Sequence, residues 1–381
     1  MRMRYLTLTT CALLVLAAPG LGWGSGSSSL REGALSVRLA AATTQQSLVS
    51  AASSNIWTAT ASMSTARASL TATRLINGRV LVVGGAREST TELYDSAGGA
   101  WLTGGSLNEP RGLHVAVRLA DGRVLVAGGG SYLASAELYD PATNRWTPTG
   151  AMSVGRIDAT GTLLRDGRVL VVGGLSGNGT GVQASAELYD PATGRWTSAG
   201  SLRTARRSHT ATPLPDGTVL VAGGSNASGW LRSAELFDPA RGRWSRVAPM
   251  ATAREGAFAT LLGTGRVLVA GGGNPSALRS AELYDPASGN WSPTGSMNGY
   301  GATGALLGDG RVLVAGGGTG DVYSPATGTW TATGPMVYPY ASAGAALLPN
   351  GQVLFAGGDK VKYCGQYACT EPIADAELYT P

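Results

Sequence analysis

The sequence is short of charge, lysine and long apolar runs, and each shortage excludes a class of protein. Only 14% of the 381 residues are charged, about half the usual share, which excludes a coiled coil. Two lysines and a net charge of +5 provide no concentrated basic face, so we expect no nucleic-acid partner. Hydrophobic residues make up 43% of the chain, which excludes disorder throughout, and the 57 glycines lack the every-third-residue period of collagen. A turn-rich, all-β globular chain remains.

The first residues are typical of a secretory signal peptide. Arginines at positions 2 and 4 precede an apolar run from Tyr5 to Leu21, and small residues follow for cleavage near Gly22. An uncleaved membrane helix is the alternative, but the run is short for a bilayer span. We therefore expect residues 1–22 to be removed and residues 23–55 to form a flexible Ser/Ala/Gly-rich lead-in. The protein is then secreted, periplasmic or on the cell surface, without membrane insertion.

A unit of roughly 46 residues recurs seven times in the rest of the chain. Each unit has a Gly-Gly pair after an apolar run, then an acidic residue that opens a sequence like Glu-Leu-Tyr-Asp, then a tryptophan. The glycine pairs begin at residues 84, 128, 173, 223, 271, 316 and 357. The acidic residues are Glu92, Glu137, Glu187, Glu235, Glu282, Asp321 and Glu377, and the tryptophans are at positions 57, 101, 146, 196, 244, 291 and 330.

Four short strands fit each unit. The first is followed by an Asn-Gly or Asp-Gly pair such as Asp166-Gly167, which predicts a two-residue type I′ hairpin. The second is a run such as Arg168–Val172, in which apolar residues follow one another without alternation, as is typical of a strand buried on both faces. The third contains the Glu-Leu-Tyr-Asp sequence, and the fourth begins at the tryptophan. One small sheet cannot bury both faces alone, so the sheets must stack radially.

The Gly-Gly, Tyr and Trp markers, with an arginine early in the first strand of most repeats, resemble the kelch repeat. The resemblance implies an all-β, seven-bladed β-propeller of four antiparallel strands per blade over residues 56–381. The array begins with a lone fourth strand, Trp57–Met63, and ends with a third strand that begins at Glu377. We therefore expect the N-terminal strand to complete the last blade and leave no open edge.

Few residues are suited to catalysis or metal binding. His114 and His209 lie at equivalent positions of the second and fourth repeats, where a packed inner strand is expected. Copper-radical oxidases of the galactose oxidase kind are also kelch propellers, but they need two histidine and two tyrosine ligands and a cysteine linked to a tyrosine. The resemblance does not extend to that site, and we expect no cofactor and no metal. Cys364 and Cys369 lie in one loop of an exported chain and predict a disulfide.

The recurring arginine early in the first strand is the candidate for function. It is present in five repeats and is replaced by Gly301 and Tyr340 in the last two, beside Tyr300 and Tyr338. The arginines either bond carbonyls between blades or form a circle that grips an acidic ligand. The loops between strands two and three vary in length and lie at the same end of the ring, where binding is expected. The candidate ligand-binding residues are Arg67, Arg111, Arg156, Arg206, Arg254, Tyr300, Tyr338, Tyr340 and Trp230.

These features favour a monomeric, non-enzymatic binding or scaffold propeller that recognises a protein or a glycan, with an acidic ligand preferred. Two alternatives stay open at this point. One is a carbohydrate-active oxidase or lyase on the same fold, and the other is a structural surface protein without a discrete ligand. Fold alone does not decide among them.

Overall fold

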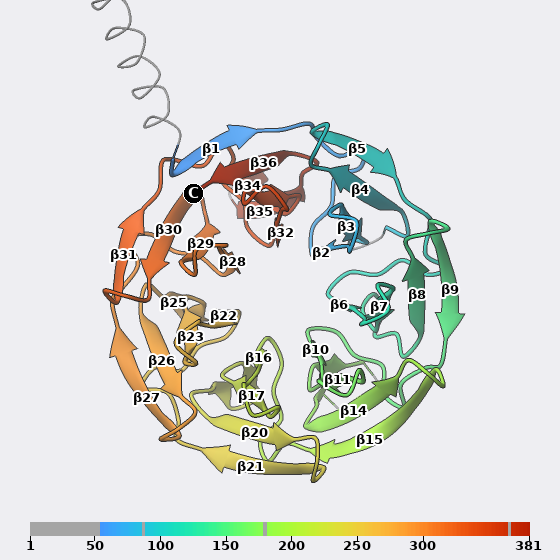
Figure 1. Cartoon of the computed structure of the whole chain (residues 1–381), viewed down its shortest axis with the longest axis vertical. Helices are drawn as coiled ribbons and strands as arrows, with labels where there is room; N and C mark the ends of the chain where they lie inside the picture. The colour runs from blue at the N-terminus through green and yellow to red at the C-terminus, as the bar shows by residue number, and fades with distance from the viewer. Residues whose placement is uncertain (1–53, 86–87, 178–180, 365–366) are drawn as a thin grey trace, which may run out of the picture. The chain divides into compact units, whose positions relative to one another are not determined.

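A computed structural model describes residues 54–85, 88–177, 181–364 and 367–381, although the side chains of residues 361–368 lie outside the description. The predicted signal peptide and nearly all of the predicted lead-in lie outside the described residues. Within the described part, the chain contains strands and turns but no helix, and hence no helix that could cross a membrane. Residues 54–381 form one compact unit of seven four-stranded antiparallel sheets arranged in a ring (Figure 1). The predicted seven-bladed propeller is confirmed.

Each sheet is one blade, and its strands follow one another from the ring centre to the rim. The first three blades are β2(Thr71–Arg74), β3(Val80–Val83), β4(Thr91–Asp95) and β5(Ala100–Thr103); β6(Val115–Arg118), β7(Val124–Ala127), β8(Ala136–Asp140) and β9(Arg145–Thr149); and β10(Thr160–Leu163), β11(Val169–Val172), β14(Ser185–Asp190) and β15(Arg195–Ser201). The next three are β16(Thr210–Pro213), β17(Val219–Ala222), β20(Ala234–Asp238) and β21(Arg243–Val247); β22(Phe258–Leu261), β23(Val267–Ala270), β26(Ala281–Asp285) and β27(Asn290–Thr294); and β28(Thr303–Leu306), β29(Val312–Gly316), β30(Thr319–Ser324) and β31(Thr329–Ala332). Blade seven is β32(Gly344–Leu347), β33(Val353–Ala356), β36(Ala376–Thr380) and β1(Ile56–Ala59).

Four of the loops between the second and third strands carry a small two-stranded ribbon of their own. These ribbons are β12(Leu175–Ser176) with β13(Gly181–Val182), β18(Ser225–Asn226) with β19(Gly229–Trp230), β24(Gly273–Asn274) with β25(Ser276–Ala277), and β34(Asp359–Cys364) with β35(Tyr367–Pro372). They rise at one end of the ring, which we call the loop face. The tight turns between strands one and two and between strands three and four lie at the other end, the turn face.

The second strand of every blade is buried on both sides, as its unbroken apolar sequence predicts. All four residues of β3, for example, have no solvent exposure, because the sheets of the two neighbouring blades cover both faces. The fourth strand is tied to the third by a tryptophan that packs on a tyrosine, as in Tyr94–Trp101 with 5.1 Å between ring centroids. The indole Nε1 of Trp101 then donates to the carbonyl of Ala61 in the preceding connection, which joins neighbouring blades.

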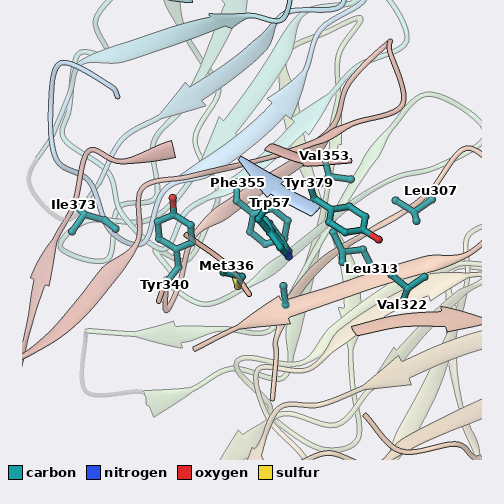
Figure 2. Close-up of a cluster of buried hydrophobic side chains, with 11 residues drawn as sticks. Trp57, Leu307, Leu313, Val322, Met336, Tyr340, Val353, Phe355, Ile373 and Tyr379 are labelled. Atoms are coloured by element: carbon teal, nitrogen blue, oxygen red, sulfur yellow. The ribbon is translucent and has the colours of Figure 1, made fainter. Parts of the chain in front are cut away.

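The ring closes through its N-terminal strand, as predicted. β1 pairs antiparallel with β36, from Ile56 opposite Thr380 to Ala59 opposite Glu377, so the blue and red ends of the chain meet in one blade (Figure 1). Trp57 packs against Phe355 and Tyr379, each with 5.1 Å between ring centroids, within a cluster shared by blades six and seven (Figure 2). The strand ends at Ala59 rather than Met63.

The predicted type I′ hairpin between strands one and two is wrong. In the first blade Gly78 has a φ of 86°, but Asn77 is not among the residues with positive φ, and the Gly78 amide donates to the carbonyl of Leu75. Ile76 and Asn77 therefore form the centre of an ordinary turn, and the glycine follows it in the left-handed conformation. The Asn77 side chain accepts from the amide of Arg79, which is the local bond that favours asparagine or aspartate here.

Candidate functional site

The recurring arginines lie inside the blades rather than around a ligand. In blade one the Arg67 Nη1 donates to the carbonyls of Gly84 and Thr90, at 2.9 and 2.8 Å. Its Nη2 donates to the Thr90 hydroxyl and to Oε1 of Glu92, which also pairs with it as a salt bridge at 3.0 Å. The side chain of Arg67 has no solvent exposure. Its donors are therefore used within its own blade.

The same arrangement recurs in five blades, which corrects the predicted circle of ligand-binding arginines. Every one of these side chains is fully buried, and its Nη2 lies 2.8–3.2 Å from the acidic residue of the same blade. A buried guanidinium whose partner is a buried carboxylate cannot reach a ligand. The pairs are Arg67–Glu92, Arg111–Glu137, Arg156–Glu187, Arg206–Glu235 and Arg254–Glu282.

The second glycine of the pair joins its blade to the next in six of the seven blades. The amide of Gly85 in blade one donates to the carbonyl of Arg111 in blade two, at 2.9 Å. A Cβ on Gly84 would lie 2.1 Å from that carbonyl oxygen, so no larger residue fits there. The bonds between blades thus run through the arginine main chain, whereas the bonds of the arginine side chain stay within the blade.

The two histidines also connect blades. Nε2 of His114 in blade two lies 2.8 Å from the hydroxyl of Thr71 in blade one, and His209 in blade four bonds Thr160 in blade three in the same way. Burial and, to a lesser extent, the positive charge of the neighbouring arginines together lower the pKa of both histidines to about 3. Both imidazoles are therefore neutral and packed, as their position in inner strands predicted.

Blades six and seven lack the arginine and differ in how they replace it. In blade six Gly301 takes its place, and the shorter Asp321 accepts bonds from the Asn298 amide, the Asn298 side chain and the Gly299 amide. In blade seven Tyr340 takes its place, and Glu377 is satisfied less fully than Asp321. Its Oε2 accepts from the Val337 amide at 2.7 Å, but its buried Oε1 has no partner among the described residues.

Burial raises the pKa of Glu377 to about 7, although the amides of Val337 and Tyr338 favour its charged form. The hydroxyl of Tyr340 is likewise buried without a partner among the described residues. Burial raises the pKa of Tyr340 strongly, and the nearby carboxylates of Glu377 and Asp375 raise it further, so the phenol stays neutral.

A pocket of about 410 Å³ opens on the loop face where the arginines are missing. Its walls come from the connections of blades five, six and seven, and they are mostly glycine, alanine and aromatic side chains. Tyr300, Tyr340, Met336 and Phe355 provide the large surfaces, and Glu255 is the one charged residue among the described lining residues. An apolar pocket with few polar groups is the usual form of a ligand site.

Exposed aromatic side chains lie beside this pocket. Trp230 is 41% exposed, and its Nε1 donates to Oε1 of Glu255 at 3.1 Å, which fixes the indole next to a lining residue. Tyr300 is 45% exposed, and the guanidinium of Arg279 lies 4.6 Å from the centre of its ring. Trp230, Glu255, Tyr300 and Arg279 together with the pocket form the candidate binding site.

The turn face has hollows too. A second space of about 410 Å³ lies between blades three and four, lined by turn residues such as Asp166, Arg168 and Asp216. Arg168 and Asp166 pair with each other there at 2.7 Å. The loop face remains the better candidate because it combines its pocket with exposed aromatic side chains and unpartnered buried groups.

The sequence motif and the fold together identify the family. The kelch motif matches residues 111–153, 160–203, 206–251 and 257–298, which correspond to blades two to five of the ring. The chain belongs to the kelch-repeat β-propeller family.

One similar solved structure is a fungal alcohol oxidase of the AA5 family in complex with copper. It is 21% identical, with a TM-score of 0.71, and the match covers 86% of this chain and 76% of that one. This likeness shows the fold alone. A search of curated proteins finds no match. In the part of this kelch propeller that the structure describes, no group of three or more histidine, cysteine or acidic residues could hold a metal ion.

The structure brings only some of the predicted site residues of this kelch propeller together. Tyr300 and Tyr340 line one pocket and Trp230 lies beside it, whereas Tyr338 is half-buried next to Tyr340, with 5.7 Å between ring centroids. The disulfide stays a prediction, because the side chain of Cys364 lies outside the described residues. Cys369 is placed on β35, opposite Lys362 of β34.

Sequence reasoning missed Glu255, Arg279 and the unpartnered Glu377. A signal for the last was present: blade seven keeps the acidic residue of the repeat but has Tyr340 where five blades have arginine.

Proposed function

We propose that this protein is a binding propeller that holds a partner polypeptide on its loop face. The observation that carries the proposal is the pocket formed by blades five, six and seven, with the exposed Tyr300 in its wall and the exposed Trp230 beside it. Tryptophan and tyrosine next to a concave apolar pocket are the side chains that most often anchor a protein interface.

The charges at the site favour a neutral or basic segment of that partner. Glu255 lies in the pocket wall, and the guanidinium of Arg279 is drawn over the ring of Tyr300. The acidic ligand expected from the sequence loses its support, because the five arginines that were to bind it are buried in ion pairs.

A glycan is the second candidate. The exposed indole of Trp230 and the exposed ring of Tyr300 provide flat apolar surfaces, and Glu255 and Arg279 provide an acceptor and donors beside them. A sugar presents both an apolar face and hydroxyl groups, so it also fits this combination of side chains.

The test is to pan a displayed peptide library and a glycan array against the purified protein and to measure the affinity of each ligand retained. We expect Trp230→Ala and Tyr300→Ala each to weaken binding by roughly tenfold or more. Ile76→Ala is the matched control, because Ile76 is an apolar side chain in a turn of the opposite face and is more exposed than Trp230 or Tyr300. Binding that both site variants retain, or that only the control loses, refutes the proposal.

A further inference from the structure

Five blades of this ring show how the fold binds a guanidinium group. In blade five, Nη1 of Arg254 donates to the carbonyls of Gly271 and Ser280, at 2.7 and 2.9 Å. Its Nη2 donates to the Ser280 hydroxyl at 3.0 Å and to Oε1 of Glu282 at 3.1 Å. The acceptors all belong to strands two and three and their ends, and we call this set of acceptors the receptor for the guanidinium. The receptor does not include the arginine itself, which precedes strand one, so it can be present in a blade that lacks the arginine.

Blade seven has the same receptor without an arginine. Glu377 lies opposite Phe355 on the second strand, as Glu282 lies opposite Val269. The Gly357 amide bonds the carbonyl of Asp375 at 3.0 Å, as the Gly271 amide bonds the carbonyl of Ser280 in blade five. Strands two and three of blade seven thus place a glycine, an acceptor residue and a glutamate in the order found in blade five.

The glutamate of this receptor is also oriented as in blade five. In both blades Oε2 accepts from a main-chain amide of the incoming connection, at 2.7 Å. The other oxygen, Oε1, meets the guanidinium in blade five, and in blade seven it is the fully buried oxygen that lacks a partner among the described residues. Glu377 therefore presents its unpartnered oxygen to the place where an arginine would lie.

Blade seven carries more negative charge at this place than the other blades. Asp375 stands where blade five has Ser280, so a carboxylate replaces a hydroxyl among the acceptors. Blade six, which also lacks the arginine, has adapted differently, since three local donors satisfy its shorter Asp321. A missing arginine can thus be compensated within a blade, and blade seven has not done so.

We propose that blade seven binds the guanidinium group of a ligand. Glu377 and Asp375 pair with the cation, the carbonyls of Gly357 and Asp375 accept its remaining donors, and the ring of Tyr338 flanks it. The group enters beside Asp375 and Tyr338, which are both partly exposed on the loop face. It displaces the Tyr340 side chain, whose hydroxyl makes no hydrogen bond among the described residues that would have to be broken.

Tyr340 also lines the candidate pocket, so the guanidinium site adjoins the proposed binding site. The inference therefore deepens the proposed function and rests on it. The guanidinium can come from an arginine of the partner polypeptide or from a small guanidino compound. Both sources have the same chemistry, and the experiment distinguishes them.

The test is a calorimetric titration of the full chain at pH 8 with agmatine, with butylamine as an ammonium probe, and with an arginine tetrapeptide and its citrulline counterpart. We expect saturable binding of agmatine or of the arginine peptide, and none of butylamine or of the citrulline peptide, whose side chains have no charge. Glu377→Gln should weaken this binding by roughly thirtyfold or more, because it removes the buried anion. Asp309→Asn on the turn face is the matched control and should bind like the original protein.

Tyr340→Arg is a second test, because it places an arginine of the chain itself at the position where five other blades have one. We expect this variant to melt at a higher temperature than the original protein and to bind neither agmatine nor the arginine peptide. Binding of agmatine assigns the site to small guanidino compounds as well, and binding of the peptide alone assigns it to a partner polypeptide. The inference is overturned if neither probe binds, or if binding persists in Glu377→Gln or in Tyr340→Arg. The effects of Trp230→Ala and Tyr300→Ala on library and glycan ligands are measured in a separate experiment. Failure of the proposed function can therefore be distinguished from failure of the guanidinium site.

Discussion

Replacing Glu377 by glutamine should make the protein more stable at alkaline pH and leave its stability nearly unchanged at acidic pH. The carboxyl is buried beside Tyr340, and burial raises its pKa from 4.5 to about 7. In the unfolded chain the group ionises near pH 4.5, whereas in the folded chain it holds its proton to about pH 7. Between these values the folded state binds more protons, so the free energy of unfolding falls as the pH rises and is constant above pH 7.

Because the pKa of Glu377 rises from 4.5 to about 7 on folding, ionisation of this carboxyl lowers the free energy of unfolding by about 3 kcal/mol at pH 8. Glutamine has the shape of the protonated acid and no charge, so Glu377→Gln should recover most of this amount at pH 8 and little at pH 5. The measurement is the free energy of unfolding in urea at both pH values. The neighbouring titratable groups Asp375, Tyr338 and Tyr340 are the same in both proteins, so the difference between them isolates Glu377.

Glu282→Gln is the matched control, because Glu282 is the equivalent residue of blade five and pairs with Arg254. This variant leaves a buried guanidinium without its carboxylate and should be destabilised by about 3–5 kcal/mol at pH 8. Opposite signs at equivalent positions are the expected result. If Glu377→Gln is no more stable than the original protein at pH 8, the carboxyl has a partner and the reasoning is refuted.

Four further outcomes are expected. Arg111→Met should lower the free energy of unfolding by about 3–5 kcal/mol, since it leaves Glu137 buried without its cation; an unchanged urea midpoint would contradict the structural role of the arginine. Trp57→Ala should cost about 3–5 kcal/mol by the same assay, because it empties the seam that closes the ring, and a loss below 1 kcal/mol would count against that seam. His114→Gln should reduce the loss of stability on acidification, since a histidine with a pKa of about 3 in the folded state costs about 2 kcal/mol at pH 5; identical pH profiles would disprove this. Mass spectrometry of the unreduced protein should find Cys364 joined to Cys369, and two free thiols would refute the disulfide.

The sequence was sufficient to predict the blades because each repeat marks the same structural positions. Trp57 at the start and Glu377 near the end are incomplete parts of one repeat, and their complementarity predicts the closure. The type of the first turn was mispredicted because Asn-Gly fits two turn geometries, and the flanking register, which decides between them, depends on the pairing of the strands.

The candidate site was less predictable, because it depends on burial and on what is missing. The position of Arg67 in the repeat does not show whether its guanidinium faces a neighbouring strand or the solvent. The pocket is lined by Gly301, which contributes no side chain, and by residues of blades five, six and seven. Such a space depends on how three blades pack, which a pattern within one repeat does not contain.

The pairing of β1 with β36 has a consequence for how the chain folds. Ile56 and Thr380 are neighbours in one sheet, but more than three hundred residues separate them along the chain. Joining two segments with this separation costs about 5 kcal/mol of loop-closure free energy, apart from a constant, unless the intervening blades have already formed. The six blades between them consist of local hairpins and can form first, which leaves the closing strand until last. Until the final residues of the chain have been made, the first strand has an exposed edge and an exposed tryptophan, and this is the stage at which the protein is most prone to aggregate.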